Sequence, residues 1–322
     1  MTYSIIGTGG IGGYYGGRLA QAGHDVHFLL HSDYEYVREH GLKVDSVNGD
    51  FVLPSPQVYD DAAKMPLSDV VLVCLKTTNN HLLPTLLQNV ADEHTIVILI
   101  QNGIGVEEDV QRQLPHLQLV AGLAFICTAK VAPGHINHQC YGQINLANYS
   151  CKDEERLQQI AEQFTQAGIP AAQVEYHEAR WKKAVWNMPF NGMTVALNTQ
   201  TDILLKHPST RQLIREQMME IVRTAKQLGV AGVDEVFVDK MIDMTDNMTP
   251  YSPSMKLDYD FHRPMEIQYI YTRPLQIARQ AGVPMHKLEM LEAELRFLED
   301  GLCETSQSRD EAYPDQSASF TF

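Results

Sequence analysis

The chain has 322 residues, a length that indicates about two domains at roughly 150 residues each. Apolar residues make up 44 % of the sequence and charged residues 20 %, which excludes a disordered chain and allows each domain a buried core. With 25 basic and 40 acidic residues the net charge is −15, which excludes broad nucleic-acid binding because such binding needs a basic surface.

Membrane insertion, secretion and a disulfide framework are not expected either. No apolar run reaches the roughly 18 residues that a membrane-spanning helix needs. The first expected strand begins almost directly after Met1, which leaves no room for a cleaved targeting peptide. The five cysteines include no C-x-x-C pair, so we expect reduced thiols and no zinc site. These features predict a cytoplasmic protein.

The first half of the chain alternates short apolar runs with amphipathic stretches. The runs are Tyr3–Ile6, Val26–Leu30, Val70–Leu75, Ile96–Ile100 and Leu119–Ile126. Runs of this kind are typical of strands buried on both faces, so the alternation predicts an α/β fold with a Rossmann-type, doubly wound parallel sheet. Between the second and third runs, Asn48-Gly49 separates Leu42–Val47 from Phe51–Leu53, which predicts a hairpin.

Beyond about residue 175 the apolar residues recur with a helical period, which predicts an all-helical second domain. The expected helices are Glu178–Thr194, Thr210–Leu228, Val233–Asn247, Met265–Ala281 and Lys287–Leu298. The boundary is expected near Gly168-Ile169-Pro170, which gives domains over residues 1–172 and 173–303. Residues 304–322 are polar and are predicted to form a mobile tail.

A glycine-rich turn lies between the first expected strand and the first expected helix. Its G-x-G-x-x-G pattern is formed by Gly7, Thr8, Gly9, Gly10, Ile11 and Gly12. Gly7 permits the tight turn, Gly9 lets the backbone approach a pyrophosphate, and Gly12 lets the helix pack against the sheet. The N-terminus of the helix offers N–H groups and a positive dipole to the phosphates. The pattern therefore predicts that the first domain binds a dinucleotide through this turn.

The end of the second strand bears on the choice between NAD and NADP. An NAD site usually has Asp or Glu there, roughly 20 residues after the glycines. Here the strand is followed by His31-Ser32-Asp33. His31 and Ser32 suit a 2′-phosphate, and Asp33 is expected to cap the next helix. The sequence thus favours NADP, with NAD as the alternative.

Polar side chains also follow two other expected strands. Lys76 comes after Val70–Leu75, and Asn102 comes after Ile96–Ile100. In an open parallel sheet the ligand lies beyond the carboxyl ends of the strands, so both side chains are expected to face the cofactor and its reaction partner.

The first helix of the second domain carries a polar stripe. Lys183, Asn187 and Asn191 are four residues apart and therefore share one helix face, although asparagine is a poor helix former. Two tryptophans beside the stripe indicate a buried helix rather than a solvated one. The stripe therefore predicts a face aimed at a ligand, and Pro189 is expected to kink or split the helix.

With these motifs the chain resembles the ketopantoate reductase (2-dehydropantoate 2-reductase) family over essentially residues 1–300. The resemblance rests on the glycine turn, Leu75-Lys76, Asn102-Gly103, the Trp-x-Lys-x3-Asn-x3-Asn stripe, Ser254-Met255 and Glu266. It implies a Rossmann domain, an all-helical domain and a substrate bound between them. It also implies NADPH-dependent reduction of a 2-oxo acid to a 2-hydroxy acid, foremost 2-dehydropantoate to pantoate in pantothenate biosynthesis.

The resemblance also implies roles for single residues. Lys183 is the proton donor, and Asn102, Asn187, Asn191 and Ser254 hold the substrate. Lys76 and Asn102 line the cofactor side, and Glu266 lies by the nicotinamide ribose and orders the site. The family often has arginine where His31 stands here, and it suggests a homodimer.

Two other functional interpretations stay open. One is a different NAD(P)-dependent dehydrogenase with a helical C-terminal domain and a phosphorylated or amino substrate, whose phosphate would need cations. The candidates for these cations are Arg180, Lys182, Lys256 and Arg263. The other is a non-catalytic dinucleotide sensor, which would have no use for Lys183 and its stripe. His135 and His138 lack a joining carboxylate or cysteine pattern, so no metal is predicted.

Overall fold

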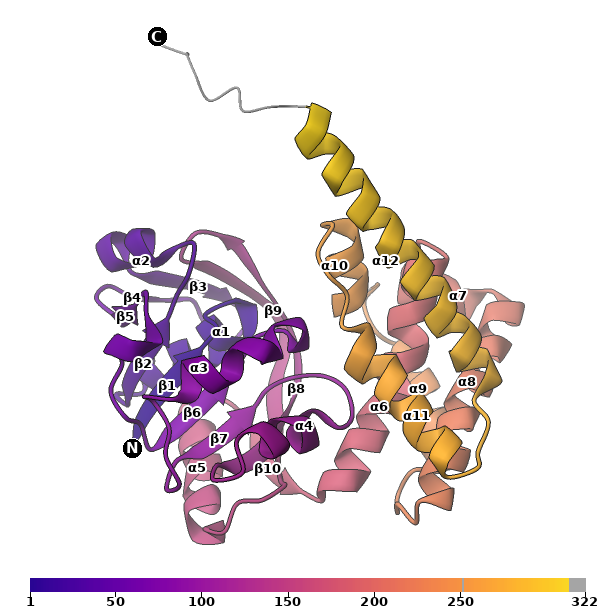
Figure 1. The fold of residues 1–322 in the computed structure, drawn as a ribbon, viewed down its shortest axis with the longest axis horizontal. Coiled ribbons are helices and arrows are strands. Elements are labelled where there is room, and N and C mark those ends of the chain that lie inside the picture. Colours follow the sequence, from indigo (N-terminus) through magenta and orange to yellow (C-terminus); the bar gives the residue numbers. More distant parts are fainter. Residues whose placement is uncertain (251, 313–322) are drawn as a thin grey trace. The chain divides into compact units, whose positions relative to one another are not determined.

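The computed structural model describes residues 1–250 and 252–312, and the side chains of 302–312 lie outside that description. The described chain divides into two compact units, Met1–Lys183 and a second one that begins at Ala184. The strands all belong to the first unit, and the chain after α6 is drawn as helices in Figure 1. Among these described residues, no helix is both long and apolar enough to cross a membrane.

The first unit contains one mixed sheet, in the order β4-β3-β9-β8-β7-β6-β1-β2-β5, with β10 on β9. The strands are β1 (Thr2–Ile6), β2 (Asp25–Leu29), β3 (Leu42–Ser46), β4 (Phe51–Leu53), β5 (Gln57–Tyr59), β6 (Val70–Val73), β7 (Ile96–Leu99), β8 (Gln118–Ala132), β9 (His135–Asn148) and β10 (Ala171–Val174). The central order β7-β6-β1-β2 is parallel throughout, as the Rossmann-type prediction requires. That fold class is confirmed.

Along the chain, the helices of the first unit alternate with these strands. They are α1 (Gly10–Gln21), α2 (Tyr34–His40), η1 (Ala62–Lys64), η2 (Thr77–Leu82), α3 (Leu83–Leu87), α4 (Val106–Gln113) and α5 (Glu154–Gln166). Alternate side chains of β1, such as Tyr3 and Ile5, pack with buried residues of α1 and α5 in one apolar cluster. This packing fixes α1, and with it the turn that precedes α1, against the sheet.

The sheet differs from the prediction in one respect, because it is not parallel throughout. The fifth predicted run is the start of β8, which continues to Ala132, turns, and pairs antiparallel with β9. β9 alternates buried and exposed residues instead of forming a continuous apolar run, and a search for such runs misses it. The predicted hairpin around Asn48-Gly49 is confirmed, with Val44 opposite Phe51.

The second unit is helical, as predicted. After α6 (Tyr176–Ala196) come α7 (Thr201–Lys206), α8 (Pro208–Gln227), α9 (Glu235–Asp246), α10 (Ser254–Asp260), η3 (Gln268–Thr272), α11 (Arg273–Gln280) and α12 (His286–Ala312). The expected apolar face of α8 is buried at Ile214, Met218 and Ile221, and α8 contacts α7, α9 and α12. Glu220, buried on α8, accepts hydrogen bonds from N–H groups in the first turn of α12, which suits a carboxylate at a helix N-terminus.

Three boundaries differ from the predicted ones. The division between the units falls inside α6, after Lys183, and not near residue 172. Pro189 does not split α6, which is continuous from Tyr176 to Ala196. The backbone of α12 is helical to Ala312, so the predicted tail begins as helix, and residues 313–322 lie outside the described residues.

Candidate active site

The glycine turn has the geometry of a phosphate-binding loop. Gly7 has φ +98°, and a Cβ there would lie 2.7 Å from Cδ2 of Leu75, so this position needs glycine. A Cβ on Gly12 would overlap the carbonyl oxygen of Gly7, which explains how closely α1 approaches the strand. A Cβ on Gly9 would meet nothing within 4 Å. Gly9 therefore faces open space at the N-terminus of α1, where a pyrophosphate fits.

The residues after β2 are placed differently from the prediction. Asp33 stands at the N-cap position of α2, but its side chain makes no capping hydrogen bond there. Its carboxylate instead accepts from Lys130 Nζ at 2.8 Å and from the Gly134 N–H at 3.2 Å. Burial alone would raise the pKa of Asp33, but these hydrogen bonds and the Lys130 charge outweigh it and lower the pKa. Asp33 is therefore an ionised carboxylate that is already paired, while His31 and Ser32 are exposed.

The ends of β6 and β7 lie side by side at the edge that the glycine turn occupies. Val73 pairs with Ile6 on one side and with Leu99 on the other. Lys76 follows as the N-cap residue of η2, and Asn102 precedes Gly103, whose φ is +107°. The predicted cofactor-side residues of the first unit thus follow neighbouring parallel strands.

Lys183 reaches the same sheet edge from the second turn of α6, which begins at Tyr176. Its Nζ donates to the carbonyl oxygen of Ala124 on β8 at 2.9 Å. Ala124 is three residues beyond Ala121, which pairs with Leu99 at the end of β7. The amine of Lys183 is therefore placed just past the strand ends, where a dinucleotide lies in a Rossmann-type sheet.

Asn187 and Asn191 follow Lys183 on α6 and belong to the second unit. Asn191 is buried, and its Nδ2 donates to the Asn187 carbonyl at 2.9 Å while its Oδ1 accepts from the Met255 N–H at 3.1 Å. This second bond holds the first turn of α10, which begins at Ser254, against α6. The amide of Asn191 thus has a structural task beside any task in binding.

Glu266 lies at the N-terminal end of its helical segment, as expected, but one residue before the first helical residue, whereas the predicted helix began at Met265. It directly precedes the helical turn that leads into η3, and its carbonyl accepts from the Ile270 N–H at 3.3 Å. η3 is a π-helical segment, a widened form that occurs often at functional sites. The sequence gives no sign of this widening. Glu266 is 4 % exposed, so its carboxylate is a buried acid at a helix start.

The four cations considered as phosphate ligands are all paired with carboxylates. Arg180 pairs with Glu107, Lys182 with Glu178, Lys256 with Asp260, and Arg263 with Asp258. The Arg180–Glu107 pair is buried, with 2 % and 0 % of the side chains exposed, and was not foreseen as a pair. The only sequence signal for it is an acidic first turn of α4 directly after the Asn102-Gly103 loop.

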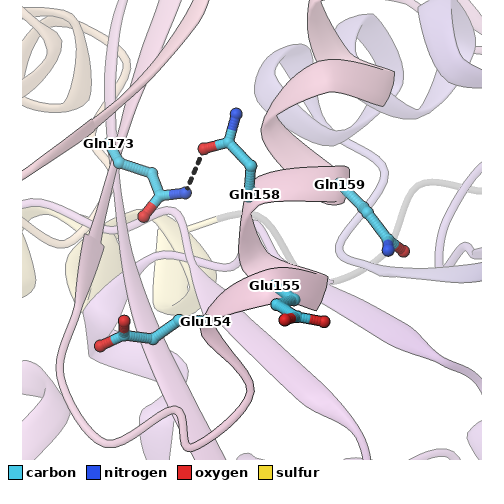
Figure 2. A pocket seen from close by; sticks show the side chains of 5 residues that line it. All are labelled: Glu154, Glu155, Gln158, Gln159 and Gln173. Carbon is cyan, nitrogen blue, oxygen red and sulfur yellow. Dashed lines mark hydrogen bonds between the residues drawn. The ribbon is translucent and has the colours of Figure 1, made fainter.

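Two other features contribute nothing to this site. A surface pocket of about 540 Å³ lies beside α5 and β10. Figure 2 shows the side chains that line it, which are Glu154, Glu155, Gln158, Gln159 and Gln173. Its five lining residues are acids and amides, which do not suit phosphates. The two histidines considered as metal ligands bond elsewhere, His135 to Asp45 and His138 to Ser46. Within residues 1–250 and 252–301, no cluster of three or more His, Cys, Asp or Glu is placed to hold a metal ion.

Comparison with known proteins gives matches over both units. The family model "Ketopantoate reductase PanE/ApbA" matches residues 3–150, and the model "Ketopantoate reductase PanE/ApbA C terminal" matches residues 175–299. A protein of Nostoc sp. described as 2-dehydropantoate 2-reductase is 46 % identical over 311 residues, which are 95 % of this chain and 97 % of the relative.

Solved structures are similar over the same length. The 2-dehydropantoate 2-reductase of Geobacter metallireducens superposes with a TM-score of 0.88 at 36 % identity, covering 92 % of this chain and 99 % of that one. A D-mandelate dehydrogenase, solved with NADH and anilino(oxo)acetate, superposes with a TM-score of 0.85 at 21 % identity, covering 94 % and 99 %. The second likeness concerns the fold alone.

Proposed function

The chain belongs to the ketopantoate reductase family and is an oxidoreductase, and on this premise we propose that it reduces 2-dehydropantoate to pantoate with NADPH, a step of pantothenate biosynthesis. The proposal depends above all on Lys183, whose amine lies at the sheet edge where the glycine turn, Lys76 and Asn102 also lie. A non-catalytic dinucleotide sensor would not need a lysine there.

Lys183 is the proposed proton donor. When bound, the reduced dinucleotide supplies a hydride to the carbonyl carbon, and negative charge then develops on the carbonyl oxygen. A positioned ammonium group stabilises that charge and donates the proton that completes the alcohol. The hydrogen bond to the Ala124 carbonyl uses one of the three donors of the ammonium group and orients it without neutralising it.

The remaining polar residues are proposed to bind. Asn102, Asn187, Asn191 and Ser254 hold the carboxylate and hydroxyl groups of the substrate, since neutral amides and hydroxyls bind these groups without adding a competing acid. Lys76 lies on the cofactor side. Glu266 is assigned to the nicotinamide ribose and to ordering the site.

The surroundings of Asp33 support NADPH as the cofactor. An acid after β2 selects NADH by accepting hydrogen bonds from the ribose hydroxyls. In this chain the carboxylate of Asp33 is engaged by Lys130 and Gly134, and the pair places a cation at Asp33, two residues after His31. A cation near the end of β2 favours a 2′-phosphate. We therefore assign NADPH, although the fold also accommodates NADH in D-mandelate dehydrogenase.

The alternatives are less well supported. A phosphorylated substrate needs cations, and the four that the sequence offered are each paired with a carboxylate. A non-catalytic sensor leaves the placement of Lys183 without a purpose. A different 2-oxo acid is the strongest competitor, since D-mandelate dehydrogenase shares the fold.

A panel of 2-oxo acids assayed with NADPH and NADH tests the proposal. We expect the highest kcat/KM for 2-dehydropantoate with NADPH. A tenfold preference for another 2-oxo acid would reassign the substrate, and a preference for NADH would reassign the cofactor. Binding of neither nucleotide would overturn the proposal altogether. The cytoplasmic location and the homodimer stay predictions, and light scattering of the purified protein checks the dimer.

A further inference from the structure

The Arg180–Glu107 ion pair is buried at the place where α6 meets the sheet. Removing two charges from water costs several kcal/mol per ion, and a buried pair is stable only if additional hydrogen bonds satisfy both groups. Here Tyr176 Oη donates to Glu107 Oε2 at 2.8 Å, and Arg180 Nη1 donates to the Gln101 carbonyl at 2.7 Å. Burial and the Glu107 charge raise the pKa of Tyr176, which keeps its hydroxyl protonated as a donor.

The hydrogen bonds continue from Gln101 to the end of β6. Gln101 Nε2 donates to the Leu75 carbonyl at 2.9 Å and to Asn80 Oδ1 at 2.7 Å. Because a carbonyl can only accept, the bond to Leu75 fixes which end of the Gln101 amide is nitrogen. One chain of contacts thus connects the start of α6 with α4 and with the loops that carry Asn102 and Lys76.

This network contains buried polar atoms that reduce the stability of the fold. Arg180 Nε, Gln101 Oε1 and Asn80 Nδ2 are buried and have no hydrogen-bond partner among the described residues of the protein. A buried polar group that lacks a partner is destabilising, because it has lost its hydrogen bonds to water. Apolar residues of similar volume commonly replace a buried ion pair without loss of stability, and often with a gain. Stability alone therefore does not account for this arrangement.

The hydrogen bonds of Arg180 also fix the position of Lys183, which lies on the next turn of α6. Arg180 and Lys183 are three positions apart on α6, about 4.5 Å along the axis and about 60° around it. Arg180 holds the helix to the Gln101 carbonyl at the end of β7, and Lys183 itself bonds to Ala124 on the neighbouring β8. A shift or rotation of this helical turn would move the amine by a similar distance, and misplacement by 1 Å can cost about 100-fold in rate.

We propose that Arg180 and Glu107 are positioning residues that fix the amine of Lys183 relative to the loops after β6 and β7. The inference rests on the proposed function, in which Lys183 donates the proton. It assigns the pair no contact with substrate or cofactor. Its effect is to hold the helical turn that carries the donor.

Arg180→Lys tests the proposal because lysine keeps the charge but is shorter and lacks the planar fork with which Arg180 bonds to Glu107 and to the Gln101 carbonyl. We expect kcat for 2-dehydropantoate to fall about 10- to 100-fold, with KM for the nucleotide within twofold. With a nucleotide deuterated at the transferred hydrogen, the isotope effect on kcat should rise, because the chemical step becomes slower than product release. The matched control is Arg112→Lys in the exposed pair with Glu108 on α4, which should change neither value.

A double-mutant cycle with Lys183→Ala separates positioning from folding. If Arg180 acts through Lys183, Arg180→Lys should change the single-turnover rate of the Lys183→Ala enzyme less than twofold. An equal loss in both backgrounds would overturn the inference and leave the proposed function standing. A Lys183→Ala enzyme as fast as the wild type would instead refute the proton donor, and the inference with it.

Tyr176→Phe provides a second variant if Arg180→Lys does not fold. It removes the 2.8 Å bond to Glu107 and leaves the ion pair in place. We expect the same fall in kcat and rise in the isotope effect, but smaller, about three- to tenfold in kcat, again with the nucleotide KM unchanged. A loss of thermal stability with kcat and the isotope effect unchanged would overturn the proposal.

Discussion

The glycine turn and the polar face of α6 are built in opposite ways. The turn is proposed to bind through its backbone, so its requirements are local and steric: a positive φ at Gly7, open space at Gly9 and close packing at Gly12. The α6 face acts through side chains whose tasks depend on distant partners, such as Ala124 for Lys183 and Met255 for Asn191. The spacing of residues along the chain is therefore enough to predict a site formed by the backbone. For a site formed by side chains, the same spacing predicts the position but not the hydrogen-bond partners on which each side chain depends.

The largest effect is expected at Lys183. We expect Lys183→Ala to lower kcat by about two to four orders of magnitude, because it removes both the proton and the charge that stabilises the oxyanion. Nucleotide affinity should be nearly unchanged, as measured by fluorescence titration. Lys182→Ala is the control, since Lys182 pairs with Glu178 one turn earlier. An inactive Lys182→Ala beside an active Lys183→Ala would show that the wrong lysine was assigned.

The next largest effect should separate two glycines of the turn. Gly9→Ala should weaken nucleotide binding about 10- to 100-fold, because the methyl group would occupy the pyrophosphate position. Its melting temperature should stay near that of the wild type, since nothing lies within 4 Å of that methyl group. Gly12→Ala should instead lower the melting temperature, because its Cβ overlaps the Gly7 carbonyl. Equal melting losses in both variants would contradict this division.

Asn191 tests the double task of an α6 side chain. Asn191→Ala removes the acceptor of the Met255 N–H and the donor to the Asn187 carbonyl, and should cost about 1–3 kcal/mol of unfolding free energy. Denaturant unfolding measures this loss. If stability is unchanged while KM for the oxo acid rises, Asn191 serves the substrate alone, and the contrast with the glycine turn weakens.

The smallest effect is expected at Lys130, which pairs with Asp33 in the segment after β2. Lys130→Ala removes a cation and leaves the Asp33 carboxylate without its partner, and both changes disfavour a 2′-phosphate. NADPH affinity should fall about three- to tenfold while NADH affinity stays equal or improves, corresponding to roughly 1 kcal/mol. Parallel titrations with the two nucleotides decide the point, and a loss of equal size for both would contradict it.

The sequence predicted the architecture of the sheet's centre, the glycine turn and the helical second unit, because hydrophobic period and glycine spacing are local signals. It missed β9, whose alternation differs from the buried runs, and the π-helical segment after Glu266. It also treated Arg180 as a possible phosphate ligand. Glu107, which neutralises it, lies 73 residues away, and no pattern along the chain connects the two.

The open space beside Gly9 has an evolutionary consequence. Positions 7 and 12 are constrained by the fold, whereas the fold leaves room for a Cβ at position 9, where the proposed ligand supplies the constraint. In a library of variants sorted for cellular abundance, small side chains at position 9 should therefore be tolerated, while those at positions 7 and 12 should be depleted. Sorting the same library for turnover should remove the position 9 variants as well. A lineage that abandoned its dinucleotide would accordingly lose Gly9 first and still encode a folded protein.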